Sequence, residues 1–151
     1  MGAVNKGLSA FKNLCAHADE IVMRADANRC RANSASLSDA ERAEASKRAD
    51  AYQALWVFIQ TTFAMLPEEV QPTAAFILLV GSDAFAKCTP VSAQWQEWST
   101  CKMVEKVVDV DQLQRLCSAA PEFSDLVATA QDDSEILGAE PPAGGAELED
   151  D

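Results

Sequence analysis

Residues 38–66, SDAERAEASKRADAYQALWVFIQTTFAML, decide the fold. Apolar residues in the second half recur three and four positions apart, which is the spacing of helix faces. They form two neighbouring stripes, one with Tyr52, Trp56, Ile59, Phe63 and Leu66 and the other with Ala51, Ala54, Phe58, Thr61 and Met65. A helix that is apolar nearly all round is a buried helix, so we expect this half to cross the core. The first half is charged and is expected to leave the body.

Both ends of this stretch carry helix boundary signals. Ser38 and Glu41 have the spacing of a capping box, which satisfies two backbone amides at a helix N-terminus. Pro67 cannot continue a helix, because it lacks the amide proton and its ring clashes with the preceding turn. We therefore predict a central helix over about residues 38–66.

The N-terminal part of the chain predicts a partner for this helix. Apolar residues step by three and four from Val4 to Ala25, which predicts one amphipathic helix of about six turns. Residues 29–36, RCRANSAS, have no such period and are rich in Asn and Ser, so we predict a loop that reverses the chain.

Further short helices follow the central one. The apolar run Ala74–Val80 could be a strand by periodicity, but no second strong strand pattern exists to pair with it, and we predict a helix. Gly81 is expected to end it. The start signals at Pro90, Asp109 and Pro121 predict three later helices.

The composition changes at Gln131. Residues 131–151 hold 8 acidic residues, no basic residue and few large apolar ones. Such a segment cannot bury enough surface to offset the entropy lost on ordering. We predict an all-α fold, with a single compact helical domain of five to seven helices in residues 1–130 and a disordered acidic C-terminal tail in residues 131–151.

The charge of the chain disfavours two classes of partner. Of the net charge of −12, residues 1–130 contribute −4, with 16 acidic and 12 basic residues, and the tail contributes −8. A nearly balanced body has no basic surface for phosphate backbones, so we expect no direct nucleic-acid binding. The longest uninterrupted apolar run is 7 residues, against the roughly 20 that a spanning helix needs, so we expect no membrane association.

The cysteines and the single histidine do not predict a catalytic or metal site. The five cysteines, at positions 15, 30, 88, 101 and 117, form no Cys-x-x-Cys pair and no zinc spacing. We predict reduced thiols, mostly in the core, of a cytoplasmic protein without a cofactor or metal. His17 has no nucleophile at helical spacing, and we expect it to face solvent.

Two groups of residues are candidates for partner binding. Trp95 and Trp98 lie three apart on one helix face, and such a pair is either core or the anchor of an interface. The tail has a terminal acidic cluster dense enough to compete with phosphate, together with two aliphatic residues. The tail candidates are Ile136, Leu137, Glu147, Glu149, Asp150 and Asp151.

These observations leave three hypotheses of function. The first is a non-enzymatic protein-interaction module, an assembly adapter or accessory subunit of a larger complex, with a viral or phage complex as one version of it. The alternative is an acidic inhibitor that blocks a basic nucleic-acid-binding surface of a partner, as anti-restriction and anti-CRISPR proteins do as a class. The third is a small enzyme or enzyme subunit with an unrecognised site.

Overall fold

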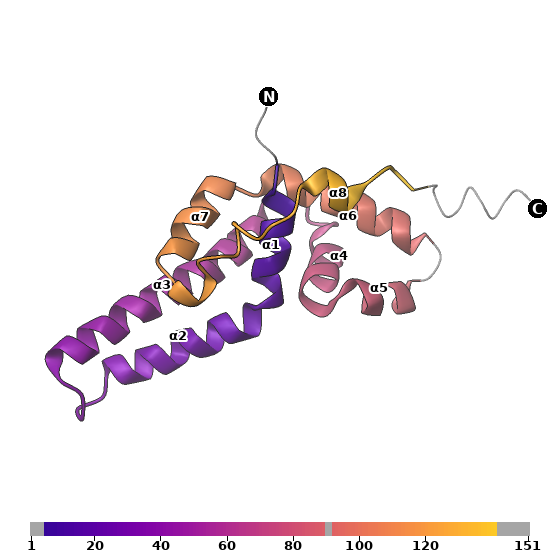
Figure 1. Cartoon of the computed structure of the whole chain (residues 1–151). Helices are drawn as coiled ribbons and strands as arrows, with labels where there is room; N and C mark the ends of the chain where they lie inside the picture. Colours follow the sequence, from indigo (N-terminus) through magenta and orange to yellow (C-terminus); the bar gives the residue numbers. More distant parts are fainter. Residues whose placement is uncertain (1–4, 90–91, 142–151) are drawn as a thin grey trace, which may run out of the picture.

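The computed structural model describes residues 5–89 and 92–141, and this part of the chain is all helical, without a strand (Figure 1). It forms a single compact domain, as predicted, but with eight α-helices where five to seven were expected, because three of them are short. The α-helices are α1 Gly7–Ala16, α2 Ala18–Ala32, α3 Asp39–Ala64, α4 Gln71–Ala75, α5 Ser82–Cys88, α6 Ala93–Val107, α7 Val110–Ser118 and α8 Asp133–Leu137. A π-helical turn, η1 (Phe76–Val80), continues α4, and a 3₁₀ turn, η2 (Pro121–Phe123), follows α7.

The central helix α3 begins as the sequence predicts. The amide of Glu41 donates to Ser38 Oγ at 3.1 Å, and the amide of Ser38 donates to Glu41 Oε1 at 2.9 Å, which completes the capping box. Helices α2 and α3 lie side by side as a long hairpin, and its charged end projects from the body (Figure 1). The apolar half of α3 lies inside the body, where α1, α4, α6 and α7 contact it.

The buried face of α3 differs from the predicted stripes. Leu55, which belongs to neither stripe, is fully buried, whereas Trp56 is only half-buried. Val57 and Met65 are 46% and 57% exposed. The sequence pattern shows that two faces of α3 are apolar. It does not show that the neighbouring helices leave part of these faces uncovered. The buried residues of α3 are Ala45, Ala49, Tyr52, Leu55, Phe58, Ile59 and Thr62.

The expected N-terminal helix is broken at His17. Helix α1 lies in the body, whereas α2 runs along α3 as far as Ala32 and takes up part of the expected loop (Figure 1). His17 was expected to face solvent, but it is half-buried. Its ring packs edge-on against Phe123, with centroids 5.4 Å apart, and its Nδ1 lies 2.9 Å from the carbonyl oxygen of Asn13. These contacts hold the bend between the two helices.

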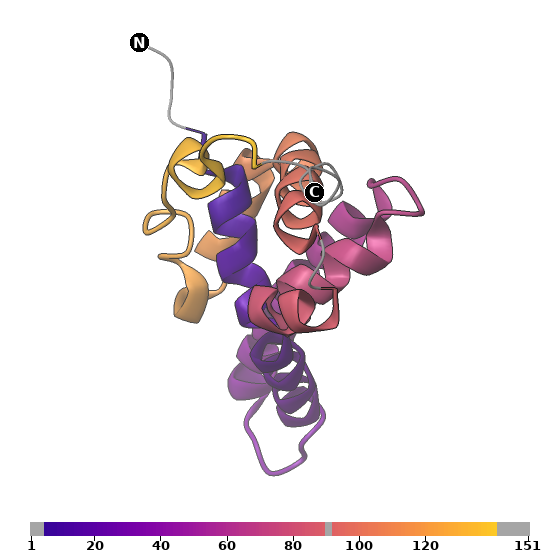
Figure 2. The same ribbon diagram turned by 90° about the vertical axis from the view of Figure 1, so that its right-hand side faces the viewer.

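The boundary of the tail also requires a correction. We expected residues 131–151 to lie outside the folded body, but residues 131–141, which we name the C-terminal strap, cross the N-terminal end of α1 (Figure 2). Asp133 is 0% exposed, and its carboxylate accepts from the amides of Leu8 at 3.0 Å and Ser9 at 3.1 Å. Helix α1 has no side-chain cap from Lys6, so this carboxylate supplies one. The acidic composition suggested solvation, but one carboxylate at a helix N-terminus is a favourable buried group.

The burial on α3 gives a first prediction. Leu55→Ala is expected to lower the free energy of unfolding by about 2–5 kcal/mol, because it leaves a cavity in the core. Trp56→Ala is expected to cost less than Leu55→Ala, because the indole is already partly in solvent. Urea denaturation of the two variants measures both values, and a larger loss for Trp56→Ala would contradict this packing of α3.

The strap gives a second prediction. Asp133→Ala is expected to cost about 2–4 kcal/mol, because it removes a helix cap and leaves two buried amides without an acceptor. Asp132→Ala is the matched control. Its carboxylate caps only the five-residue α8, through the amide of Ser134 at 2.8 Å, and a loss within about 1 kcal/mol is expected. Equal losses of stability for the two variants in thermal melts would show that the cap of α1 contributes no more to stability than the cap of α8.

Candidate protein-interaction site

A groove runs along the uncovered face of α3 and is closed on its other side by α7 and the end of α6. We name it the α3–α7 groove, and its volume is about 480 Å³. Half of its lining residues are apolar, and the two charged ones, Asp50 on α3 and Asp109 at the start of α7, are exposed and form its margins. The lining residues are Asp50, Gln53, Ala54, Val57, Phe58, Thr61, Thr62, Met65, Val107, Asp109, Gln112 and Leu116.

The sequence of α3 explains why this groove is uncharged inside. The 17 residues between Asp50 and Glu68 contain no charged side chain, although one side of the helix there faces solvent. Val57, Thr61 and Met65 follow one another at four-residue spacing, so they stand above one another on the same face. All three are exposed. A protein surface normally places charges at such positions, so an uncharged exposed helix face is typical of an interaction site.

The margins of the groove carry carboxylates. Asp50 accepts from Arg29 Nη2 at 2.8 Å, and Asp109 caps α7 by accepting from the amide of Gln112 at 3.0 Å. Both aspartates are exposed, and no basic residue is among the lining residues. The groove therefore favours a partner with positive charges next to an apolar face.

A second cleft contains three of the residues predicted to bind a partner. Trp98 on α6 lies with Ile136 and Leu137 of α8 around a cleft of about 210 Å³, which we name the Trp98 cleft. The other lining residues are Lys12, Gln94, Glu97, Cys101, Ala139 and Pro141.

The remaining sequence candidates do not join this cleft. Trp95 is half-buried on α6 and is not among the residues that line it. Glu147, Glu149, Asp150 and Asp151 lie outside the described residues. The apolar pattern of α3 predicted burial, so it did not indicate Val57 and Met65 as surface residues, and no pattern indicated Asp133 as a buried cap.

Trp98 has one unsatisfied group. Its Nε1 is buried and has no hydrogen-bond acceptor in the described part of the chain. The ammonium of Lys102 lies 5.7 Å from the centroid of the ring, within the range of a cation–π contact. A buried donor without an acceptor costs free energy, so the indole is a candidate contact for a ligand that brings an acceptor.

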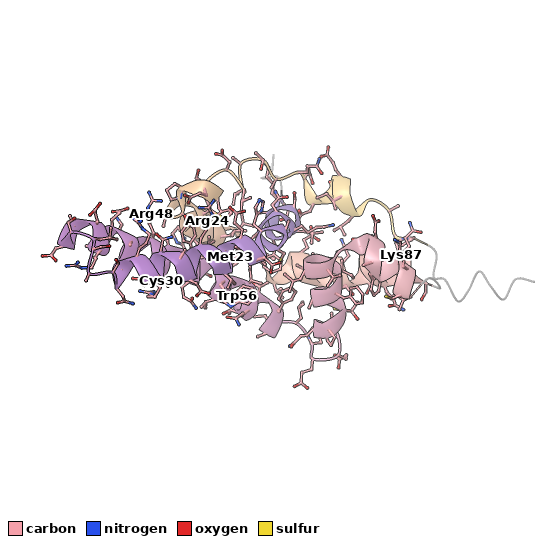
Figure 3. All side chains as sticks on the ribbon, turned by 90° about the horizontal axis from the view of Figure 1, so that it is seen from below. Met23, Arg24, Cys30, Arg48, Trp56 and Lys87 are labelled. Carbon is pink, nitrogen blue, oxygen red and sulfur yellow. The ribbon has the colours of Figure 1, made fainter. Side chains whose placement is uncertain are left out.

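A polar cluster fastens the turn η2 to the hairpin. The buried hydroxyl of Tyr52 donates to Glu122, and Nη1 of Arg24 and Nη1 of Arg48 each lie 3.5 Å from Glu122 Oε2. The hydrogen bond from Tyr52 lowers the pKa of Glu122, and burial raises the pKa of Tyr52. Figure 3 shows Arg24 and Arg48 on the edge of the hairpin next to this turn. The two arginines and the hydroxyl already contact the carboxylate, so this cluster has a structural role.

Three thiols and one carboxyl group have shifted pKa values because they are buried. Burial raises the pKa of Cys15 to about 12 and those of Cys101 and Cys117 to about 11, so these three core thiols stay protonated. Burial, and then the negative charge of Asp133, raise the pKa of Glu105. Asn5 Nδ2 donates to Glu105 Oε2 at 3.1 Å.

The position of Glu105 beside the strap predicts a pH effect. A raised pKa in the folded state means that ionised Glu105 opposes folding, so this part of the stability is present at low pH and is lost as the pH rises through the folded-state pKa. Glu105→Gln is therefore expected to raise the melting temperature at about pH 7. The two proteins are expected to converge at about pH 4, where Glu105 is largely protonated. Melting curves across this range measure the difference, and a destabilised variant at neutral pH would contradict the assignment.

The described residues contain no group of three His, Cys, Asp or Glu side chains placed to hold a metal ion. In that same part of the chain, each helix is too short or too polar to cross a membrane. Comparisons of this chain with protein-family models, with curated proteins and with solved structures give no match.

Proposed function

We propose that this protein is a non-enzymatic interaction module, an adapter or accessory subunit of a larger complex, and that the α3–α7 groove receives a helix of a protein partner. The partner helix has aliphatic residues on one face and Lys or Arg beside them. The observation that carries this proposal is the uncharged, exposed face of α3, which stands between carboxylates of α3 and α7.

The dimensions of the groove suit a helix. Its lining residues on α3 extend from Asp50 to Met65, which is four helical turns or about 24 Å. A partner helix that buries its apolar face along this length contributes anchors at intervals of three and four residues. The exposed Val57 and Met65 are the groove side chains with most apolar surface left to bury.

The charge of the chain favours a basic partner over a second copy of the same chain. Two copies each carry a net charge of −12, so their approach is opposed at ordinary salt. A basic helix instead meets Asp50 and Asp109 at the margins of the groove, which speeds association and fixes orientation.

The alternative hypothesis, an acidic inhibitor of a nucleic-acid-binding partner, has less support. It needs a dense run of free carboxylates to replace phosphates, and the densest run, residues 147–151, lies outside the described residues. Asp133 is buried against α1 and is not free to replace a phosphate. The uncharged, exposed face of α3 supports an adapter instead, so we favour that function.

The groove predicts binding of a simple amphipathic helix. A synthetic peptide of about 14 residues, built from Leu and Lys at helical spacing, is long enough to follow the groove. It is expected to shift the NMR signals of Val57, Thr61 and Leu116. Met65→Lys is expected to weaken binding at least tenfold, which corresponds to about 1.4 kcal/mol, because it removes an apolar contact and repels the lysines of the peptide.

The matched control uses the other exposed methionine. Met23, labelled in Figure 3, is 69% exposed on α2 and is not among the residues that line the groove, so Met23→Lys is expected to change affinity less than about threefold. A Leu and Glu peptide of the same pattern is expected not to bind. Equal effects of the two methionine variants, or binding of the acidic peptide, would contradict the proposed function.

A further inference from the structure

The strap is recognised by the body through a small set of directed contacts. Besides the two bonds from the amides of Leu8 and Ser9 to the carboxylate of Asp133, the amide of Asp133 donates to the carbonyl oxygen of Asn5 at 2.7 Å. The amide of Gln131 donates to Ser9 Oγ at 2.8 Å. The N-terminal part of α1 and the residues just before it thus form hydrogen bonds with both the backbone and one side chain of the strap.

The aliphatic residues of α8 provide the second half of this recognition. Ile136 and Leu137 follow Asp133 by three and four residues, and both line the Trp98 cleft between α1 and α6. The lining residues also include Lys12 and Cys101, from α1 and α6. An aspartate at one end and two aliphatic residues at the other therefore define the sequence that this surface accepts.

The strap does not fill this surface completely. About 210 Å³ remains beside Ile136 and Leu137, and Trp98 Nε1 has no acceptor among the described residues. Helix α8 has only five residues, and a helix of that length has little stability of its own in water. A short segment held by few contacts opens at a lower free-energy cost than the core.

We propose that the surface formed by the N-terminal turn of α1 and the Trp98 cleft is a peptide-binding site for a short acidic and aliphatic segment of a partner protein, with the pattern Asp-x-x-Ile-Leu. The chain's own strap occupies this site as an intramolecular ligand. The partner segment replaces Asp133, Ile136 and Leu137 one for one, and a larger residue at the last position extends into the space that Leu137 leaves. This site is separate from the α3–α7 groove and does not depend on its function.

The test uses the full chain with a weakened strap. The double variant Asp133→Ala, Leu137→Ala removes the carboxylate and one anchor, and the probe is the synthetic peptide QDDSEILG, which copies residues 131–138. The variant is expected to bind it, with shifts of the Leu8 and Ser9 amide signals in NMR spectra. The wild-type protein is expected to bind it at least tenfold more weakly, because its tethered strap competes at a high effective concentration.

Two altered peptides test the recognition chemistry. Replacing the second Asp of the peptide by Asn is expected to weaken binding at least tenfold, because it removes the charge-assisted bonds to the α1 amides. Replacing Leu by Phe is expected to tighten binding, because the ring fills more of the cleft. A folded double variant that does not bind QDDSEILG would overturn the proposal, and so would peptides that bind without regard to the Asp.

Hydrogen exchange of the wild-type protein keeps the proposal testable if the double variant does not fold. The amides of Leu8 and Ser9 are expected to exchange through local opening, at least tenfold faster than the amide of Leu55 in the core. Exchange of all three amides at one common rate would show that the strap opens only when the whole domain unfolds, and the proposal would then be wrong.

Discussion

The burial of one face of α3 is the constraint on which the rest of the structure depends. Helix α2 covers one side along most of its length, and α1, α6 and α7 contact other parts of its apolar half. A helix of 26 residues offers more surface than these neighbours can cover. The third side therefore remains open along residues 51–65, where the sequence has no charged side chain, and the α3–α7 groove is the result of this incomplete coverage.

Features that depend on residues close in sequence could be predicted. The capping box of Ser38 and Glu41 and the cap from Asp109 to Gln112 each join residues three positions apart, and the structure confirms both. Gly81, with φ 131°, ends η1 as expected of a residue that tolerates this conformation. Periodicity likewise predicted the all-α class, because it reports on local geometry alone.

Features that depend on distant residues could not be predicted. Asp133 caps a helix that begins more than one hundred residues earlier, and nothing near either residue indicates the pairing. Leu55 and Trp56 are both apolar. Which of them is buried depends on where the helices that are distant in sequence pack against α3. The same limit explains the candidate sites. The sequence analysis predicted Trp98, Ile136 and Leu137 as binding residues, and the structure places them around one cleft. It did not predict the α3–α7 groove, because the apolar residues of that groove indicated a core.

The contact between the strap and α1 has a consequence for synthesis on the ribosome. Helix α1 is synthesised before the strap, and the acceptor for its first amides is made only after more than one hundred further residues. At about 5–20 residues per second, α1 waits roughly 6–25 s for Asp133. During this interval the N-terminal turn of α1 and the Trp98 cleft lack the strap. The domain thus reaches its final topology only after the strap has been synthesised, and until then a nascent chain exposes a surface that the folded protein covers.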